Sequence, residues 1–313
     1  MPGAKIDTHA HYVPPVYRRY LEEVGYFGGQ ATPAWSPEAA LDEMATLGVE
    51  TSVLSVARPG FWFGNADRAA AMARQVNEYA ADLVREQPDH FGLFAALPLP
   101  DLDRAMQEVE HAFDELHCDG VILLANTDGV YLGDPALDEL MAELDRREAV
   151  VFVHPNALPA EPVPGVPVFV ADFLLDTTRA ALNMVRHGVL RRFPRLKVIL
   201  SHGGGLLPYA SHRIASLTPM GEGGSVDRAG FLAECAAFWF DTALTASPHS
   251  MPSLLAFAQP GHVLYGSDWP YAREDNSEYF TAQLDAYPLD DDQRRSIERG
   301  AAEHLIPRLA RPR

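Results

Sequence analysis

The sequence predicts a (β/α)8 TIM barrel, in which eight parallel strands alternate with helices. Eight short segments rich in Val, Ile, Leu and Phe alternate with longer amphipathic segments along the 313 residues. Nearly continuous apolar runs are expected for parallel strands that are covered on both faces. The predicted strands are residues 4–11, 50–57, 91–99, 120–126, 149–156, 196–203, 237–243 and 262–268.

Helix start signals lie between these segments. A residue whose side chain can accept a hydrogen bond from the first helical turn precedes each amphipathic run. The expected starts are Ser36, Asn65, Asp101, Asp134, Asp176 and Ser247. Glycine or proline follows several of these runs, as at Gly48 and Pro194, and is expected to end the helix.

Two segments are longer than ordinary loops: residues 12–35 after the first strand and residues 157–175 after the fifth. Long insertions after barrel strands belong to the face that binds substrates. The alternative fold, a doubly wound open sheet, usually has a glycine-rich first turn, and residues 12–20 contain none. We therefore predict one barrel domain over residues 1–313, with an insertion after strand 1 and a long loop after strand 5.

The composition excludes several classes of protein. A formal charge of −18 argues against nucleic acid or an anionic membrane as the main partner. Cys118 and Cys235 alone provide neither a disulfide framework nor a cysteine-rich zinc cluster. No basic region followed by an apolar run lies near the start, and no stretch approaches the ~20 apolar residues of a membrane span. We expect a cytoplasmic protein.

Side chains that bind metals stand at the carboxyl ends of four predicted strands, which face the active-site mouth in a barrel. The first strand ends in His9 and His11, whose side chains point the same way because they are two residues apart. The fifth ends in His154, the sixth in His202 and the eighth in Asp268. Three imidazoles and a carboxylate can bind a divalent transition metal, and a fourth imidazole nearby can act as a base.

This pattern resembles the amidohydrolase superfamily. Residues 176–214, with "SHGGG", residues 265–271, "YGSDWPY", and residues 35–44, "WSPEAALDEM", are similar to one branch of it. That branch contains aminocarboxymuconate-semialdehyde decarboxylase and the o-hydroxybenzoate-type decarboxylases, and the resemblance runs from residue 5 to about residue 306.

The resemblance implies roles for the strand-end residues. Its ligand set for a single zinc ion, or alternatively manganese, is His9, His11, His154 and Asp268. His202 is the implied catalytic imidazole. Two-metal amidohydrolases commonly use a lysine on the fourth strand, and "GVILLAN" (120–126) has none, which favours one ion.

The sequence differs from these relatives at positions where they recognise the substrate. Aminocarboxymuconate decarboxylases have an arginine shortly before the position of Trp35, but residues 28–34 hold none. Phe169 stands at a position occupied by tryptophan in those enzymes. Arg213 matches an arginine that reaches into the neighbouring subunit's site. The resemblance thus implies a homodimer with Phe169 and Arg213 as substrate-binding residues, but not the same substrate.

Two reactions fit these residues. In one, a small aromatic or conjugated carboxylic acid of the o-hydroxybenzoate type loses carbon dioxide, and Asp268 protonates the substrate carbon. In the other, His202 helps to form metal-bound hydroxide, which hydrolyses a small lactone, amide or ring carbonyl compound. The family motifs favour decarboxylation. Aromatic residues expected in the loops also suit a flat substrate: Phe61, Trp62, Phe63, Phe169 and Trp269.

Other features point to no further activity. Arg58, at the end of the second strand, is a candidate to contact a carboxylate, although a structural ion pair is the expectation. The "HGGG" run is not part of an α/β-hydrolase, because the sequence has no Gly-x-Ser-x-Gly. It is not a P-loop either, because no Gly-Lys-Ser/Thr follows.

Overall fold

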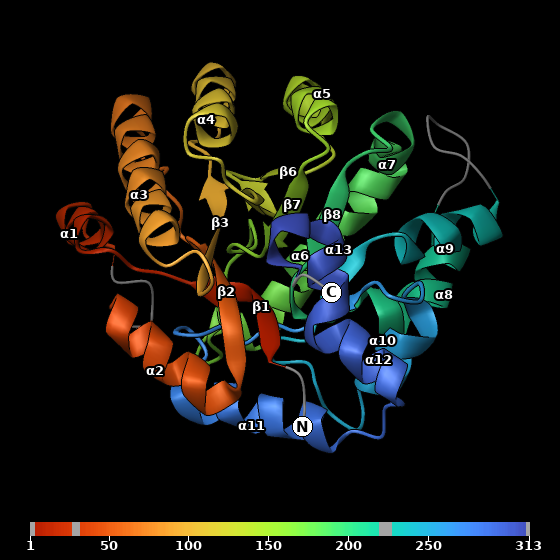
Figure 1. Ribbon diagram of the computed structural model, residues 1–313. Helices are drawn as coiled ribbons and strands as arrows, with labels where there is room; N and C mark the ends of the chain where they lie inside the picture. Colours follow the sequence, from red (N-terminus) through yellow and green to blue (C-terminus); the bar gives the residue numbers. More distant parts are fainter. Residues whose placement is uncertain (1–3, 27–31, 219–226, 311–313) are drawn as a thin grey trace.

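Eight parallel strands form a nearly closed barrel with helices around its outside (Figure 1). The computed structural model describes residues 4–26, 32–218 and 227–310. In sheet order the strands are β1 (Lys5–His11), β2 (Val49–Ser55), β3 (Phe91–Ala96), β4 (Gly120–Leu124), β7 (Val150–His154), β8 (Lys197–Leu200), β9 (Trp239–Asp241) and β10 (Val263–Leu264). A short antiparallel hairpin, β5 (Asn126–Thr127) and β6 (Val130–Tyr131), follows β4. The predicted barrel and its eight strands are confirmed.

Helices follow the strands as expected for this fold. The α-helices are α1 (Pro15–Glu23), α2 (Pro37–Leu47), α3 (Ala66–Glu86), α4 (Leu102–Asp114), α5 (Asp138–Arg146), α6 (Val168–Arg186), α7 (Val189–Arg192), α8 (Leu207–Leu217), α9 (Arg228–Ala236), α10 (Met251–Phe257), α11 (Glu274–Ala286), α12 (Asp291–Arg295) and α13 (Ala301–Leu305). Single turns are η1 (Pro135–Leu137), η2 (His202–Gly204), the π-turn η3 (Ser296–Gly300) and η4 (Pro307–Leu309).

The barrel closes between β1 and the segment after β10. Thr8 N donates to Tyr265 O at 3.1 Å, and Asp268 N donates to His9 O at 2.8 Å. The buried carboxylate of Asp7 supports this closure, since it accepts hydrogen bonds from Ser267 Oγ (2.5 Å) and Ser267 N (3.1 Å). These bonds bring Asp268 beside His9, although 259 positions of sequence numbering, 268 less 9, separate them.

Most of the helix starts predicted from N-cap residues are confirmed by the structure. Ser36 Oγ accepts from Ala39 N at 3.1 Å at the start of α2, and Gly48 ends this helix with a φ of 69°. Asn65 and Asp101 cap α3 and α4 in the same way. Asp134 caps the turn η1, which leads into α5.

Two predicted helix starts are wrong. Helix α6 begins at Val168, and Asp176 lies buried inside it, because its carboxylate accepts hydrogen bonds from Asn126 and Tyr131 instead of capping a helix. Helix α10 begins at Met251 and not after Ser247, because Ser247 Oγ accepts from Ser250 N in a preceding turn.

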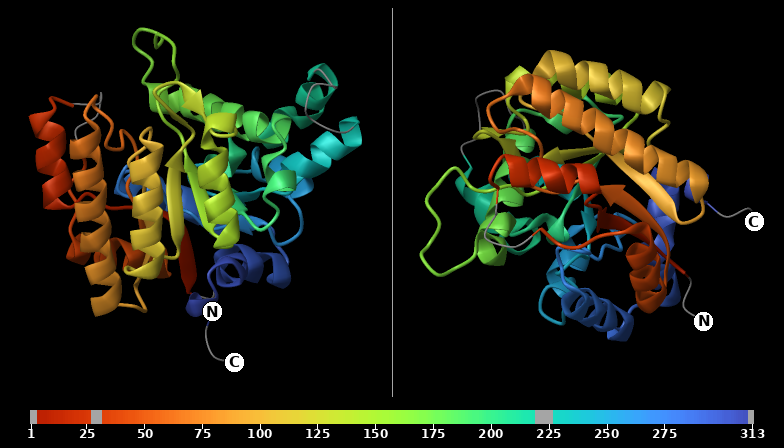
Figure 2. Two further views of the ribbon diagram at one scale, coloured as in Figure 1. Left: turned by 90° about the horizontal axis from the view of Figure 1, so that it is seen from above. Right: turned by 90° about the vertical axis from the view of Figure 1, so that its left-hand side faces the viewer.

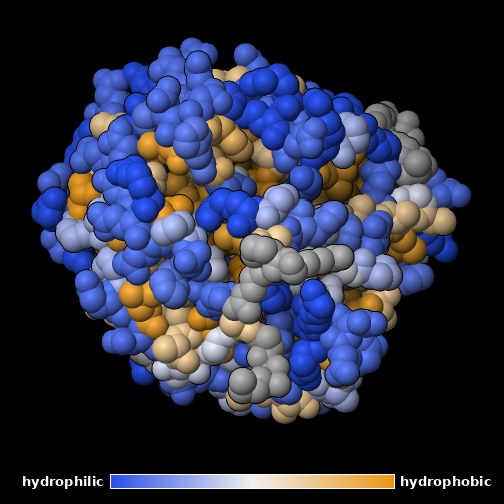
Figure 3. Space-filling view, viewed as in Figure 1, coloured by the Kyte–Doolittle hydropathy of each residue, from blue (hydrophilic) through white to orange (hydrophobic). Residues whose placement is uncertain are grey.

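Both predicted insertions lie where expected, and each contains a helix. Helix α1 lies in the segment after β1, and the first two turns of α6 lie in the segment after β7. The loop before α6 projects from the end of the barrel opposite to both termini (Figure 2). Helices of the described part of the chain are too short or too polar to cross a membrane. Hydrophilic side chains cover most of the face in Figure 3.

Candidate functional site

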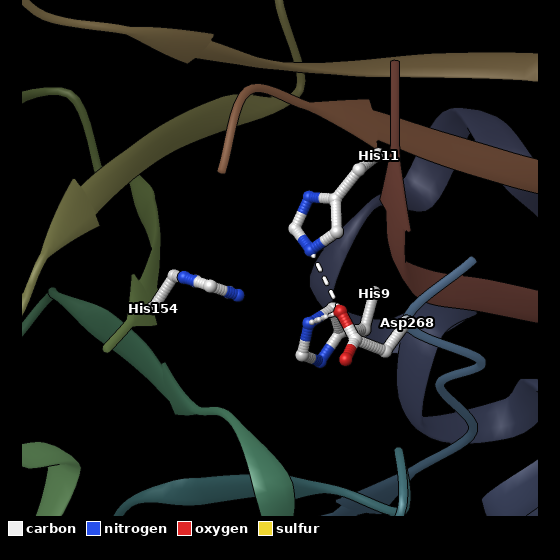
Figure 4. A group of neighbouring side chains, drawn as sticks. All are labelled: His9, His11, His154 and Asp268. Carbon is white, nitrogen blue, oxygen red and sulfur yellow. Dashed lines mark hydrogen bonds and ion pairs between the residues drawn. The ribbon is translucent and has the colours of Figure 1, made fainter. Parts of the chain in front are cut away.

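Four predicted ligands meet at the carboxyl end of the barrel. His9 and His11 end β1, His154 ends β7, and Asp268 follows β10. Each offers one ligand atom to the group, these atoms all lie within 4.8 Å of one another, and all four residues are buried. Figure 4 shows His154 pointing toward the other three from the opposite side.

Hydrogen bonds fix the orientation of two of the imidazoles. His9 Nδ1 lies 2.7 Å from Asp241 Oδ2, and His154 Nδ1 lies 2.9 Å from the main-chain oxygen of Pro155. Both oxygens only accept, so Nδ1 must carry the hydrogen in each ring. The Nε2 lone pairs of these two rings are therefore left to bind a metal ion.

His11 follows the same arrangement. Its Nδ1 lies 2.9 Å from Ser55 Oγ, and that hydroxyl donates to Ala10 O at 3.0 Å. The serine oxygen therefore accepts from His11 Nδ1, and His11 Nε2 keeps its lone pair. Three Nε2 atoms with free lone pairs beside one carboxylate are the donor set of a divalent transition metal. The residues present fit such an ion.

The charges of the site also favour a cation. Burial alone would lower the pKa of His9, but the carboxylates of Asp241 and Asp268 outweigh it and raise the pKa to about 10, so that without a metal ion His9 Nε2 binds a proton near pH 7. A metal ion would take the place of this proton on the Nε2 lone pair. His9 Nε2 is nonetheless buried without a hydrogen-bond partner. Burial lowers the pKa of both His11 and His154, so these rings are neutral near pH 7. The two carboxylates thus favour positive charge, a proton or a metal ion, at His9 Nε2.

His202 lies beside this group but outside it. It begins the turn η2 after β8, with a φ of 52°. Its Nε2 is 3.4 Å from Asp268 Oδ2, whereas Asp268 Oδ1 is the atom near His9 and His11, at 3.2 and 3.1 Å. His202 Nδ1 is buried without a partner. Asp268 thus connects the ligand group to a separate imidazole.

Sequence reasoning missed Asp241. This buried residue ends β9, and its two oxygens serve different parts of the site: Oδ2 accepts from His9 and Oδ1 accepts from His202 N at 2.8 Å. The available signal was its position, because it is the one carboxylate near the carboxyl end of the predicted seventh strand. Asp241 thus holds one predicted ligand, His9, and the neighbouring His202 in one arrangement.

A cavity of about 270 Å³ opens onto His154, His202 and Asp268. Of the five aromatic residues expected to face substrate, only Phe169 lines it. Phe61 and Trp269 are buried elsewhere. The other aromatic side chains of the cavity wall are Tyr26, Phe173 and Tyr271. Phe173 could have been found one helical turn after Phe169, and Tyr271 three residues after Asp268.

The two arginines singled out by sequence differ in location. Arg58 lines the cavity, and its guanidinium carbon lies 5.2 Å from the centre of the Phe173 ring. The expected structural ion pair is wrong, because no carboxylate of the described residues pairs with Arg58. Arg213 lies exposed on α8 and does not line the cavity of its own chain. Part of the arginine-free stretch before Trp35, residues 28–31, lies outside the described residues.

The chain is similar to known proteins over nearly its whole length. A family model described as amidohydrolase matches residues 6–308. A 6-methylsalicylic acid decarboxylase of Penicillium expansum is 39% identical over 321 residues, which are 98% of this chain and 97% of that protein. A solved amidohydrolase II structure has a TM-score of 0.90 at 32% identity and covers 97% of this chain and 99% of its own.

A second solved structure shares the fold at lower identity. It is a dihydroxybenzoic acid decarboxylase from Polaromonas sp. JS666 with bound manganese and the inhibitor 2-nitroresorcinol. Its TM-score is 0.80 at 21% identity, and the match covers 99% of this chain and 98% of that one.

Proposed function

Because the chain belongs to the amidohydrolase family, we propose that it is a metal-dependent decarboxylase of small aromatic carboxylic acids of the o-hydroxybenzoate type. The resemblance to the decarboxylase branch is confirmed, since relatives matched over nearly their full length bear that activity in their names. The observation that carries the proposal is the convergence of His9, His11, His154 and Asp268 beside a cavity walled by aromatic side chains. A flat acid fits such a wall.

We propose that these four side chains hold one divalent ion, zinc or manganese. Imidazole and carboxylate ligands suit both metals, and a fold neighbour contains manganese. When bound, the ion would act as a Lewis acid toward oxygen atoms of the substrate. The remaining chemistry is assigned to side chains of this protein.

Asp268 and His202 are proposed to deliver the proton. In the reaction one proton joins the ring carbon that bears the carboxylate, the carbon–carbon bond breaks, its electron pair stays with the ring, and carbon dioxide leaves. Burial alone would raise the pKa of Asp268, but His9, His11 and His202 outweigh it and hold that pKa well below its usual range. Asp268 is therefore ionised at rest and must first take the proton, which His202 Nε2 is placed to give across 3.4 Å.

The reaction is tested by offering purified, metal-loaded protein a panel of acids, lactones and amides. We expect carbon dioxide to be released from 6-methylsalicylate or 2,6-dihydroxybenzoate, with the corresponding phenol formed in equal amount. Gas release and phenol are measured in parallel with lactone and amide hydrolysis. Turnover of a lactone or an amide without carbon dioxide would replace the decarboxylase by a hydrolase and leave the metal proposal intact.

A homodimer is proposed on two grounds. Arg213 matches the arginine that relatives use in a partner's site, and here it is exposed and does not line its own cavity. Large apolar side chains on and beside α8 are also exposed, among them Tyr209 at 84% and Leu217 at 65%. Apolar exposure of this kind marks contact surfaces. Arg213 and Phe169 are the substrate-binding residues of this proposal.

Asp241 allows a further prediction. In Asp241→Asn the amide oxygen can still accept from His202 N, so the amide NH₂ then faces His9 Nδ1. The hydrogen of His9 must move to Nε2, where it blocks the ligand position. We expect metal affinity to fall by about 10- to 100-fold.

The measurement is the metal dissociation constant of the folded variant, by competition with a chelator. Asp145→Asn is the matched control, because Asp145 is also a buried carboxylate but pairs with Arg195 away from the site. An unchanged affinity in Asp241→Asn would mean that His9 does not need this hydrogen bond.

A further inference from the structure

Arg58 lines the cavity, and the ring of Phe173 lies near both its guanidinium and the predicted metal ligand His154. Its guanidinium carbon lies 5.2 Å from the centre of the Phe173 ring, and that ring is 6.3 Å from the ring of His154. On another side of the same cavity, the ring of Tyr271 is 5.4 Å from that of His11.

The charge of Arg58 has no counterion in the described part of the chain. Its Nε is buried and lacks a hydrogen-bond partner, although the protein carries a formal charge of −18. The other arginine of the cavity wall, Arg273, is 76% exposed and lies 3.6 Å from Asp275. A partly buried guanidinium without an anion is costly unless a ligand supplies one.

We infer that Arg58 binds the carboxylate of the aromatic acid, an inference that rests on the proposed function. The Phe173 ring lies within cation–π distance of the guanidinium, and the guanidinium nitrogens suit a planar, bidentate carboxylate. The carboxylate is the group that the reaction removes. Arg58 therefore distinguishes the acid from its phenol product, and the product loses this contact when carbon dioxide leaves.

The inference is tested by comparing an acid with the same ring lacking the carboxylate. The ligands are 6-methylsalicylate and 3-methylphenol, and the variants of the metal-loaded protein are Arg58→Gln and Arg58→Lys. In Arg58→Gln we expect KM for the acid to rise by about 10- to 100-fold with a smaller change in kcat, because one charge-assisted pair is lost. The inhibition constant of the phenol should change by less than about twofold, and Arg58→Lys should fall between wild type and Arg58→Gln.

Arg68→Gln is the matched control. Arg68 also lies over an aromatic ring, that of Tyr20 at 5.1 Å, but it pairs with Glu23 and does not line the cavity. It should leave both ligands unaffected. Equal weakening of acid and phenol in Arg58→Gln would show that Arg58 only supports Phe173, and an unchanged KM would place the carboxylate elsewhere.

The same experiment distinguishes failure of the proposed function from failure of the Arg58 assignment. If the wild-type protein binds the acid but releases no carbon dioxide, the decarboxylase proposal fails. Calorimetric dissociation constants of acid and phenol then replace KM and still decide the role of Arg58. If the wild-type protein binds no hydroxybenzoate at all, the Arg58 assignment is wrong as well.

Discussion

His154→Ala is expected to lose the divalent ion and to reduce decarboxylation by more than about 100-fold. His154 supplies the ligand atom that approaches the other three from the far side of the site (Figure 4). Among the described residues, His9, His11, His154 and Asp268 are the one group found that could hold a metal ion. Elemental analysis should give about one zinc or manganese per wild-type chain and almost none per chain of the variant.

A matched control separates loss of a ligand from loss of a histidine. His187 Nδ1 also lies within hydrogen-bond distance of a main-chain oxygen, that of Asn183 at 3.0 Å, but His187 is outside the ligand group. His187→Ala should keep both metal and activity. A full metal content in folded His154→Ala protein would exclude His154 from the ligand set, and a wild-type value near two would indicate a second metal site.

The sequence was sufficient for the barrel because the signals for it are local. Parallel strands covered on both faces need continuous apolar runs, and the eight runs were visible. Helix starts at Ser36, Asn65 and Asp101 follow from hydrogen bonds to the next turn, so they too were predictable. Asp176 carries the same local signal, but tertiary hydrogen bonds use its carboxylate.

The convergence of the four predicted ligands could be expected from the sequence because the fold brings strand ends together. His9 and Asp268 meet only when the barrel closes, yet knowing that both end strands is enough to place them at one mouth. The directions of side chains on the loops follow no such rule. Phe61 was expected to face substrate but turns into the core, and its direction follows from neither residue type nor spacing.

The separate roles proposed for His154 and His202 do not follow from the residues alone, because both are histidines at strand ends. The structure distinguishes them by their surroundings. His154 Nδ1 is fixed by Pro155 O, which leaves Nε2 to the ligand group. His202 is held through its main-chain N–H by Asp241, and its ring faces the other oxygen of Asp268.

This difference gives the second large effect, in His202→Asn. Asparagine is chosen because His202 has a φ of 52°, a left-handed conformation that asparagine tolerates better than alanine. The variant should keep about one metal ion per chain, since the four ligands remain. Decarboxylation should fall by about 100- to 10,000-fold, because the group proposed to pass a proton to Asp268 is gone.

Metal content and kcat must therefore be measured on the same preparation of His202→Asn. The comparison with His154→Ala decides the assignment, because the two variants should be similarly inactive and differ only in bound metal. Loss of the ion from both would make His202 a ligand, and the proton would then have to reach Asp268 by another route. Retention of the ion with nearly full activity would remove His202 from the proton path, because the 3.4 Å contact with Asp268 would then have no part in the reaction.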